Sequence, residues 1–204
     1  MSFFPIFLRL ERRRCVVVGA GKLAEPKIAG LLRAGARVLV VAPNATRRIV
    51  QWSREHEIRW TQRKFQPRDL ARAFLVIAAT GLTEVNACVF NAARRQNIPC
   101  NAVDDPSHCD FFYPAVLRRG PFQIGISTSG ASPALAQRLR CEFERLFSRE
   151  FGDWVAHLGA MRKQILARGL PPALRRQTLH RIASDEHFQR FLKGRAAIVR
   201  ARSR

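Results

Sequence analysis

A short apolar run that leads directly into a glycine-rich turn is the feature that most restricts the fold of this chain. Residues 15–18 read Cys-Val-Val-Val, and Gly19-Ala20-Gly21 follows without a spacer. A continuous apolar run of this length predicts a strand that is buried on both faces of a sheet. Residues 23–34 then repeat apolar side chains at helical spacing and end at Gly35. A buried strand, a tight turn and a helix are therefore expected in direct succession.

The same alternation continues through the first half of the chain. Apolar segments predict further strands at residues 37–41, 58–61, 74–79 and 98–103, and a short one at 5–8. Helical patterns lie between them, at about 45–55 and 84–96. Strands that alternate with helices at this spacing predict an α/β fold, a Rossmann-like doubly wound parallel sheet.

The pattern changes after about Asp110. Residues 115–119 and 122–127 predict a hairpin, and Ser132-Pro133 predicts the start of a long helix that ends near Phe147, with the serine as N-cap and the proline at the first helical position. From Phe151 the chain is expected to be helical, with a break at residues 169–172. We predict three parts, namely residues 1–113, 114–148 and a small helical domain at 149–204.

The glycine turn has the properties of a dinucleotide-binding loop. Gly19 permits a tight turn, Gly21 lets a pyrophosphate approach the backbone, and Ala24 is a small residue at the third position of the pattern. The N–H groups of Lys22 and Leu23 at the helix start would face the anion. A plain strand-to-helix turn is the alternative, and the buried strand before it favours the dinucleotide.

The acidic residue that usually binds the ribose about 20 residues further on is missing. Pro43 and Asn44 follow the second predicted strand instead, and Asn44 could bind the ribose as a neutral group. Arg47 and Arg48 come next, so this segment leaves NAD and NADP both open.

An acidic segment follows the last strand of the predicted sheet. The chain has six Asp, and three of them fall at positions 104, 105 and 110. Parallel sheets bind ligands at the carboxyl ends of their strands, so a carboxylate there could act as a general base or a metal ligand. His108 and Cys109 could contribute to a divalent-ion site. An ordinary turn rich in Asp and Pro explains the segment equally well.

A loop of small hydroxyl residues precedes the long helix. Ser127, Thr128 and Ser129 could bind an anion together with the N–H groups of the helix start. An ordinary capped helix is the alternative.

The formal net charge of +21 would attract nucleic acid, an anionic membrane or a polycarboxylate. The 36 basic residues are spread over the chain, whereas nucleic-acid readers gather them on one face or interleave them with aromatic residues. No apolar stretch is long enough to span a membrane, no signal peptide is evident, and the five cysteines form no Cys-x-x-Cys pair. We therefore expect a cytoplasmic protein with reduced thiols, without a membrane or a specific nucleic-acid partner.

Taken in order, these segments resemble the precorrin-2 dehydrogenase/sirohydrochlorin ferrochelatase family, found alone or as the N-terminal module of sirohaem synthases. The resemblance covers about residues 3–150. It rests on Pro5-Ile6-Phe7, Cys15–Gly21 with Ala24 and Lys27, Val40–Pro43, Ala78–Thr80, Asn86, Cys100–Asp104, Phe111 with Pro114-Ala115, and Ile126–Pro133.

The resemblance implies an NAD-binding domain, a dimerisation segment and a helical domain in an intertwined homodimer. It implies oxidation of precorrin-2 to sirohydrochlorin with NAD+ as acceptor, and some members also insert ferrous iron. Asp104 takes the position of the family's central aspartate, and the nucleotide loops fall on Gly19–Leu23, Pro43–Asn44 and Ala79–Thr80. Ser127, Thr128, Ser129 and His108 are the candidate substrate-binding residues, and no metal ligands are assigned.

Two residues depart from the family pattern. Pro26 stands where the family usually has Arg, which is tolerable only if Pro26 lies in the first helical turn. Thr128 stands where one branch carries Ser. Two other classes remain open, namely an NAD-sensing regulatory module without catalysis and a basic nucleic-acid-binding protein.

Overall fold

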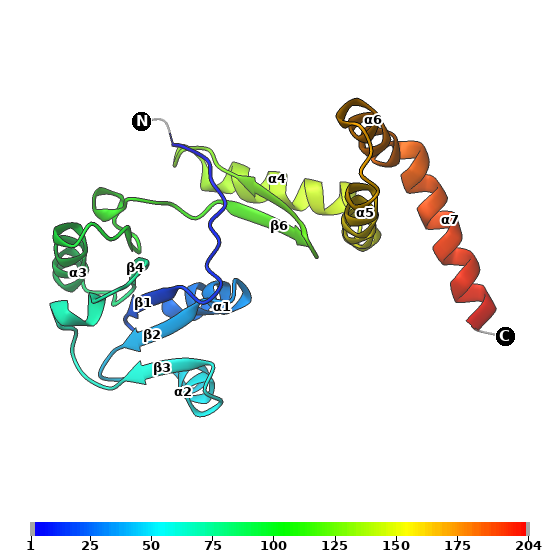
Figure 1. Ribbon diagram of the computed structural model, residues 1–204. Helices are drawn as coiled ribbons and strands as arrows, with labels where there is room; N and C mark the ends of the chain where they lie inside the picture. The colour runs from blue at the N-terminus through cyan, green and yellow to red at the C-terminus, as the bar shows by residue number, and fades with distance from the viewer. Residues whose placement is uncertain (1–2, 203–204) are drawn as a thin grey trace. The chain divides into compact units, whose positions relative to one another are not determined.

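The computed structural model describes residues 3–202, which form two compact units, Phe4–Tyr113 and Pro114–Arg202, the second of which also includes Phe3. We call them the sheet unit and the hairpin–helix unit. The sheet unit contains a five-stranded parallel sheet in the order β3-β2-β1-β4-β5 (Figure 1). Its strands are β1 (Arg14–Val18), β2 (Arg37–Val41), β3 (Ile58–Thr61), β4 (Leu75–Ala78) and β5 (Cys100–Ala102). The predicted doubly wound α/β fold is confirmed.

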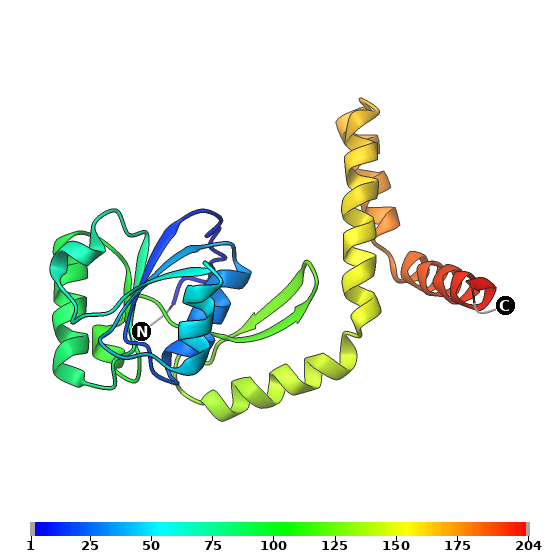
Figure 2. The same ribbon diagram turned by 90° about the horizontal axis from the view of Figure 1, so that it is seen from below.

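Three helices cover the two faces of this sheet. The helices are α1 (Ala24–Arg33), α2 (Arg47–Arg54) and α3 (Thr83–Arg95). Cys15 and Val17 of β1 face the core beneath α1 and α2, whereas Val16 and Val18 face the core beneath α3. Because successive strand residues point to opposite faces, a strand covered on both sides must be apolar throughout. Figures 1 and 2 show α3 on the opposite side of the sheet from α1 and α2.

The first helix also settles the position of the unusual proline. Helix α1 begins at Ala24, so Pro26 lies in the first turn, where its missing N–H has no helical partner. Ala34 and Gly35, with φ +72°, end the helix as the sequence predicted.

Two strand predictions need correction. Residues 5–8, expected to form a strand, form none, and Phe4 and Phe7 are 86% and 77% exposed. Strand β1 already has β2 and β4 on its two sides, so it offers no free edge to the segment before it. Strand β5 is shorter than predicted because it begins after Pro99, which has no N–H to donate, and the chain turns at Asp104, where φ is +63°. Two short 3₁₀ helices, Pro67–Leu70 and Pro106–His108, were not predicted.

The hairpin–helix unit begins with the antiparallel hairpin of β6 (Ala115–Arg119) and β7 (Phe122–Ile126), which pairs as predicted. Helix α4 (Pro133–Leu146) follows, with Ser132 as N-cap through a 3.2 Å bond from the Leu135 N–H to its Oγ. Helices α5 (Arg149–Ala167), α6 (Pro172–Ile182) and α7 (Asp185–Arg202) complete the unit. The predicted break at 169–172 separates α5 from α6, and a second break near Ala183 was not predicted.

A glycine lets α5 pack closely on the hairpin. A Cβ at Gly152 would lie 2.4 Å from the carbonyl oxygen of Arg119 in β6. The Arg119 side chain also donates to the carbonyls of Phe147 and Glu144, near the end of α4. The backbone contact at Gly152 therefore joins the hairpin to the helices.

We expect Gly152→Ala to lower the stability of the hairpin–helix unit by about 1–3 kcal/mol, because the added methyl group has no space beside the β6 backbone. Gly159→Ala in the same helix is the matched control. A Cβ at Gly159 meets nothing within 4 Å, so this change should stabilise by up to about 1 kcal/mol through helix propensity. Denaturant unfolding of both variants checks the prediction. Equal stability of the two variants would contradict it.

Candidate functional site

The loops after β1, β2 and β4 meet at the carboxyl ends of the parallel strands. The Gly19 N–H donates to the carbonyl of Val41 at 2.9 Å, and the Thr46 N–H donates to the carbonyl of Ala20 at 3.0 Å. The Ala79 N–H donates to the carbonyl of Val18 at 2.7 Å. These bonds place the glycine turn, Pro43–Asn44 and Ala79–Thr80 at the carboxyl ends of neighbouring strands, where such sheets bind ligands.

Gly19 is required by the fold itself. Its φ is +103°, and a Cβ there would lie 2.3 Å from the carbonyl oxygen of Ala79. Any other residue would clash with the loop after β4 and adopt an unfavourable backbone conformation. The glycine therefore brings two of the cofactor loops into contact.

Gly21 has no such internal role. Its φ is not positive, and a Cβ there would meet nothing within 4 Å. Within residues 3–202, the N–H groups of Gly21, Lys22 and Leu23 donate to no acceptor, and Leu23 precedes α1 without a side-chain cap. Open backbone donors at the positive end of a helix fit the pyrophosphate of a dinucleotide.

A buried amide shapes the loop after β4. The Asn86 Oδ1 accepts from the Thr80 N–H at 3.2 Å and from the Thr80 hydroxyl at 2.7 Å. The Leu82 N–H in turn donates to the Thr80 hydroxyl at 3.1 Å. Asn86 thus holds Thr80 in place, a role that its position in a helical segment of the sequence did not reveal.

Pro43 and Asn44 are exposed at the end of β2, as a ribose-binding position requires. Arg48 lies 4.0 Å from the carboxylate of Glu25 in the first turn of α1, and its guanidinium stacks over Trp52. In NADP-binding proteins, an arginine beside this loop accepts the phosphate on the ribose. Arg47 and Arg48 are the two candidates here, and Arg48 already has the acidic neighbour Glu25.

The three aspartates of the acidic segment have different roles. Asp110 accepts the N–H of Cys100 at 2.9 Å and so fixes the start of β5. Asp105 accepts from the Ser107 hydroxyl at 2.5 Å and lies 2.7 Å from His108 Nδ1, and these hydrogen bonds lower its pKa. Within the described residues, the exposed carboxylate of Asp104 makes no hydrogen bond or salt bridge. Asp104 is therefore the one of the three whose carboxylate has no hydrogen-bond partner among the described residues.

The backbone places Asp104 at the carboxyl ends of the strands, just after β5. The N–H of Val103 donates to the carbonyl of Ala78 at 2.9 Å, which joins the end of β5 to the end of β4. Asp104 follows with φ +63°, a left-handed conformation that Asp tolerates better than most residues.

His108 belongs to the loop network. Its Nδ1 lies next to Asp105, and its ring makes an edge contact with Phe90 of α3 at a centroid distance of 5.0 Å. Nε2 is the ring nitrogen left for another partner. Among residues 3–202, no three His, Cys, Asp or Glu side chains are grouped so that they could hold a metal ion.

Lys27 was not among the site residues that the sequence predicted, although it lies within electrostatic reach of Asp104. The Lys27 ammonium of α1 lies 3.9 Å from the ring centroid of Tyr113. Partial burial lowers the pKa of Lys27, and the negative charge of Asp104 opposes that shift. In the sequence, Lys27 stood out only as part of the family pattern. Its neighbours Asp104 and Tyr113 lie more than 70 positions further along the chain, so no local pattern links them to it.

The hydroxyl loop lies in the hairpin–helix unit and is stabilised internally. The Ser129 N–H donates to the Ser127 hydroxyl, and the Ser132 N–H donates to the Thr128 hydroxyl, each at 3.1 Å. Ser129 and Gly130 both have positive φ, so the backbone turns sharply before α4.

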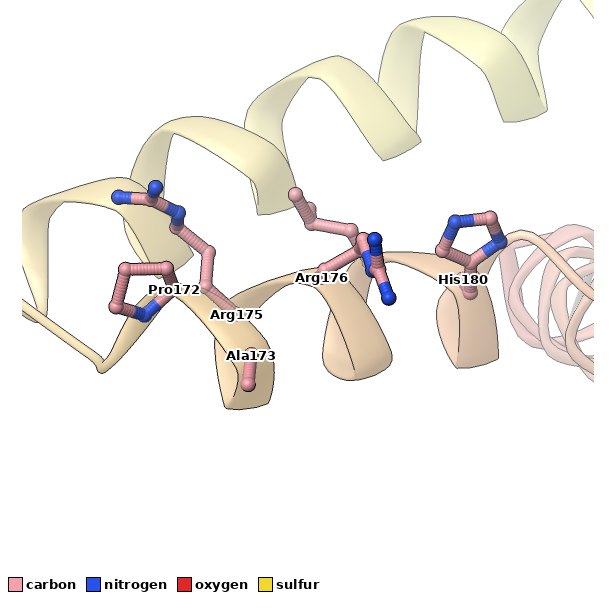
Figure 3. Close-up of a pocket in the computed structure, with 6 residues that line it drawn as sticks. Pro172, Ala173, Arg175, Arg176 and His180 are labelled. Atoms are coloured by element: carbon pink, nitrogen blue, oxygen red, sulfur yellow. The ribbon is translucent and has the colours of Figure 1, made fainter.

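A hollow of the hairpin–helix unit lies away from this loop. Figure 3 shows it along α6, with Pro172, Ala173, Arg175, Arg176 and His180 beside it. None of the predicted site residues lines this hollow, which is open to solvent. A second hollow, beside Arg37 and Trp60, includes the amino ends of β2 and β3, away from the cofactor loops. We attach no function to either.

No helix within residues 3–202 has the length and the apolar character that crossing a membrane requires.

Comparisons with known proteins agree with this geometry. A family described as putative NAD(P)-binding matches residues 6–115, and a sirohaem biosynthesis protein central family matches residues 119–146. The chain is 38% identical to a siroheme synthase of Nitrosospira multiformis and 40% identical to one of Methylococcus capsulatus, over 98% and 96% of its length. It spans 43% and 41% of those two proteins.

A solved structure extends the likeness to the whole fold. The precorrin-2 dehydrogenase SirC superposes with a TM-score of 0.78 at 26% identity, covering 94% of this chain and 98% of SirC. The family match covers more than half of the chain and contains all three cofactor loops. The chain therefore belongs to the putative NAD(P)-binding family, in the form that carries the sirohaem-biosynthesis central segment.

Proposed function

We propose that this chain oxidises precorrin-2 to sirohydrochlorin with NAD+ as the acceptor. The observation that carries the proposal lies at the carboxyl ends of the parallel strands. There an uncapped helix start and Asp104 follow strands of the same sheet, and among residues 3–202 neither the N–H groups of that helix start nor the carboxylate of Asp104 has a hydrogen-bond partner. The likeness to SirC over nearly the full length of both chains and the identity with siroheme synthases support the substrate.

The residues then take the following roles. The N–H groups of Gly21, Lys22 and Leu23 bind the cofactor pyrophosphate, and Asn44 binds the ribose. NAD+ held there supplies a hydride acceptor. Asp104 accepts the proton that the substrate loses when it is oxidised.

We assign the remaining candidates to the substrate. Ser127, Thr128 and Ser129 provide hydroxyl and backbone donors for its carboxylates. His108 contributes its Nε2, because Asp105 already occupies Nδ1. Insertion of ferrous iron into sirohydrochlorin would use Asp104 again, as the base that removes pyrrole protons.

The test is to incubate the protein with precorrin-2 and NAD+ and to record the spectra of NADH and of the macrocycle, with and without Fe2+. Growth of NADH together with sirohydrochlorin supports the dehydrogenase, and a further change only with Fe2+ supports ferrochelatase activity. NAD+ binding without turnover would favour the NAD-sensing module, and a salt-dependent DNA shift would favour the nucleic-acid reader.

We further propose a homodimer that is formed through residues 114–148. A two-stranded hairpin is marginally stable by itself, and the 14-residue helix α4 buries only Ala136. Leu135 and Leu146 on this helix are 38% and 71% exposed. A second copy would cover these apolar side chains.

Light scattering at micromolar concentration should therefore give twice the 23.2 kDa mass of the chain. Leu146→Glu should shift the equilibrium towards the monomer, because it places a charge in an apolar interface. Leu174→Glu is the matched control, since Leu174 is also exposed, at 47%, but lies on α6. A wild-type protein that scatters as a monomer would contradict the proposal.

The cysteines are consistent with a cytoplasmic location, which we also propose. All five are free thiols, and burial raises the pKa of Cys15 to about 11 and that of Cys100 to about 12. Such buried thiols are inert, as suits a reducing compartment.

A further inference from the structure

Lys27 carries a positive charge that no acidic group among residues 3–202 pairs in a salt bridge. Its ammonium forms no hydrogen bond and no salt bridge with another described residue, although the side chain is half-buried. Three N–H donors thus remain open beside the ring of Tyr113. A cation that is partly removed from water gains from an anionic partner, because burial without one is unfavourable.

Two features hold this ammonium in place. The backbone of Lys27 is fixed in α1, where Lys27 is the fourth residue and follows Leu23 by four positions. The ammonium lies 3.9 Å from the Tyr113 ring centroid, and such a cation–π contact contributes about 0.5–1 kcal/mol at an exposed site. The side chain is therefore ordered before a ligand arrives, which reduces the entropic cost of binding.

An acidic residue within electrostatic reach of Lys27 indicates the role of this lysine. Asp104 acts on Lys27 electrostatically but forms no salt bridge with it, so neither group satisfies the other. A base and an unpaired cation in one neighbourhood suit a substrate that carries both an acidic proton and carboxylates. We infer that Lys27 is a substrate-positioning residue whose ammonium binds a carboxylate of the polycarboxylate tetrapyrrole next to Asp104. This inference rests on the proposed function.

The alternatives predict different measurements. If Lys27 bound the cofactor pyrophosphate, its loss would weaken NAD+ binding. If Lys27 only packed against Tyr113, its loss would lower stability and leave substrate binding unchanged. If its charge acted only at long range, any lysine of the sheet unit would have the same effect.

The experiment compares Lys27→Met, Lys27→Arg and Lys64→Met. Lys64 is exposed in the sheet unit and its side chain has no partner among the described residues, so Lys64→Met removes the same charge away from Asp104. We expect Lys27→Met to raise the KM for precorrin-2 by about 10- to 100-fold, the range of a charge-assisted hydrogen bond. We expect kcat to change by less than about threefold and the Kd of NAD+ to stay constant, because the lost contact is one of binding alone. Lys27→Arg should retain most of the affinity, and Lys64→Met should equal the wild type.

Binding of uroporphyrin, an unreactive macrocycle with eight carboxylates, gives a readout that is independent of turnover. Its Kd, followed by porphyrin fluorescence, should weaken in Lys27→Met as much as the KM does. The inference is overturned if Lys27→Met matches Lys64→Met in both assays, or if NAD+ affinity falls instead. A wild-type protein that binds uroporphyrin but produces no NADH would reject the proposed oxidation, while the comparison of variants would still decide the role of Lys27.

Discussion

Asp104→Asn is expected to lower kcat for precorrin-2 oxidation by about 100- to 10,000-fold, the usual contribution of a general acid–base group. The Kd of NAD+ should change by less than about twofold, because Asp104 lies after β5 and not in the three cofactor loops. Asn is the informative replacement because it tolerates the φ of +63° and removes only the charge. Single-turnover kinetics with calorimetry for NAD+ measures both quantities.

Two further variants test whether the effect belongs to the carboxylate. Asp104→Gly keeps the left-handed backbone without any side chain, so it should be as inactive as Asp104→Asn. Asp105→Ala removes the partner of Ser107 and His108, and we expect it to loosen the loop and retain turnover within about tenfold. If Asp105→Ala abolishes turnover and Asp104→Asn does not, the catalytic carboxylate is the neighbouring one. If neither matters, the acidic segment is a structural turn.

Gly21→Asp is expected to abolish NAD+ binding in a protein that is still folded. A Cβ at position 21 meets no described atom within 4 Å, so the carboxylate has room in front of the N–H groups at the start of α1. It would repel the pyrophosphate and occupy its site. Calorimetry should detect no NAD+ binding, and thermal unfolding should remain within about 3 °C of the wild type, a shift below 1 kcal/mol.

Gly19→Ala provides the contrast. Its Cβ would lie 2.3 Å from the Ala79 carbonyl at a φ of +103°, so this variant should lose stability by at least about 1–2 kcal/mol, the cost of the left-handed conformation alone. The two glycines of one turn should therefore separate into one needed for folding and one needed for the ligand. Unchanged NAD+ affinity in folded Gly21→Asp would show that the cofactor does not bind at this turn.

Local patterns were sufficient for most of the fold. Strands β2 and β3 and helix α4 lie where the sequence placed them, because apolar runs, caps and glycine turns act over a few neighbouring residues. The strand predicted at residues 5–8 was wrong because the prediction used local composition alone. The segment has the local composition of a strand, but pairing needs a free sheet edge, and the sheet order gives β1 two neighbours already.

The sequence alone determined the α/β sheet, the glycine turn and the cluster of acids at the end of β5, because each is written in contiguous residues. Only the tertiary structure decided which of these residues are free to act. Asp105 and Asp110 each accept hydrogen bonds within their loop, whereas the Asp104 carboxylate accepts none from residues 3–202. Gly19 faces Ala79 and Gly21 faces open space. Lys27 meets Tyr113, 86 positions away. Such contacts join distant segments, and their partners are chosen by how the chain packs, which no local pattern contains.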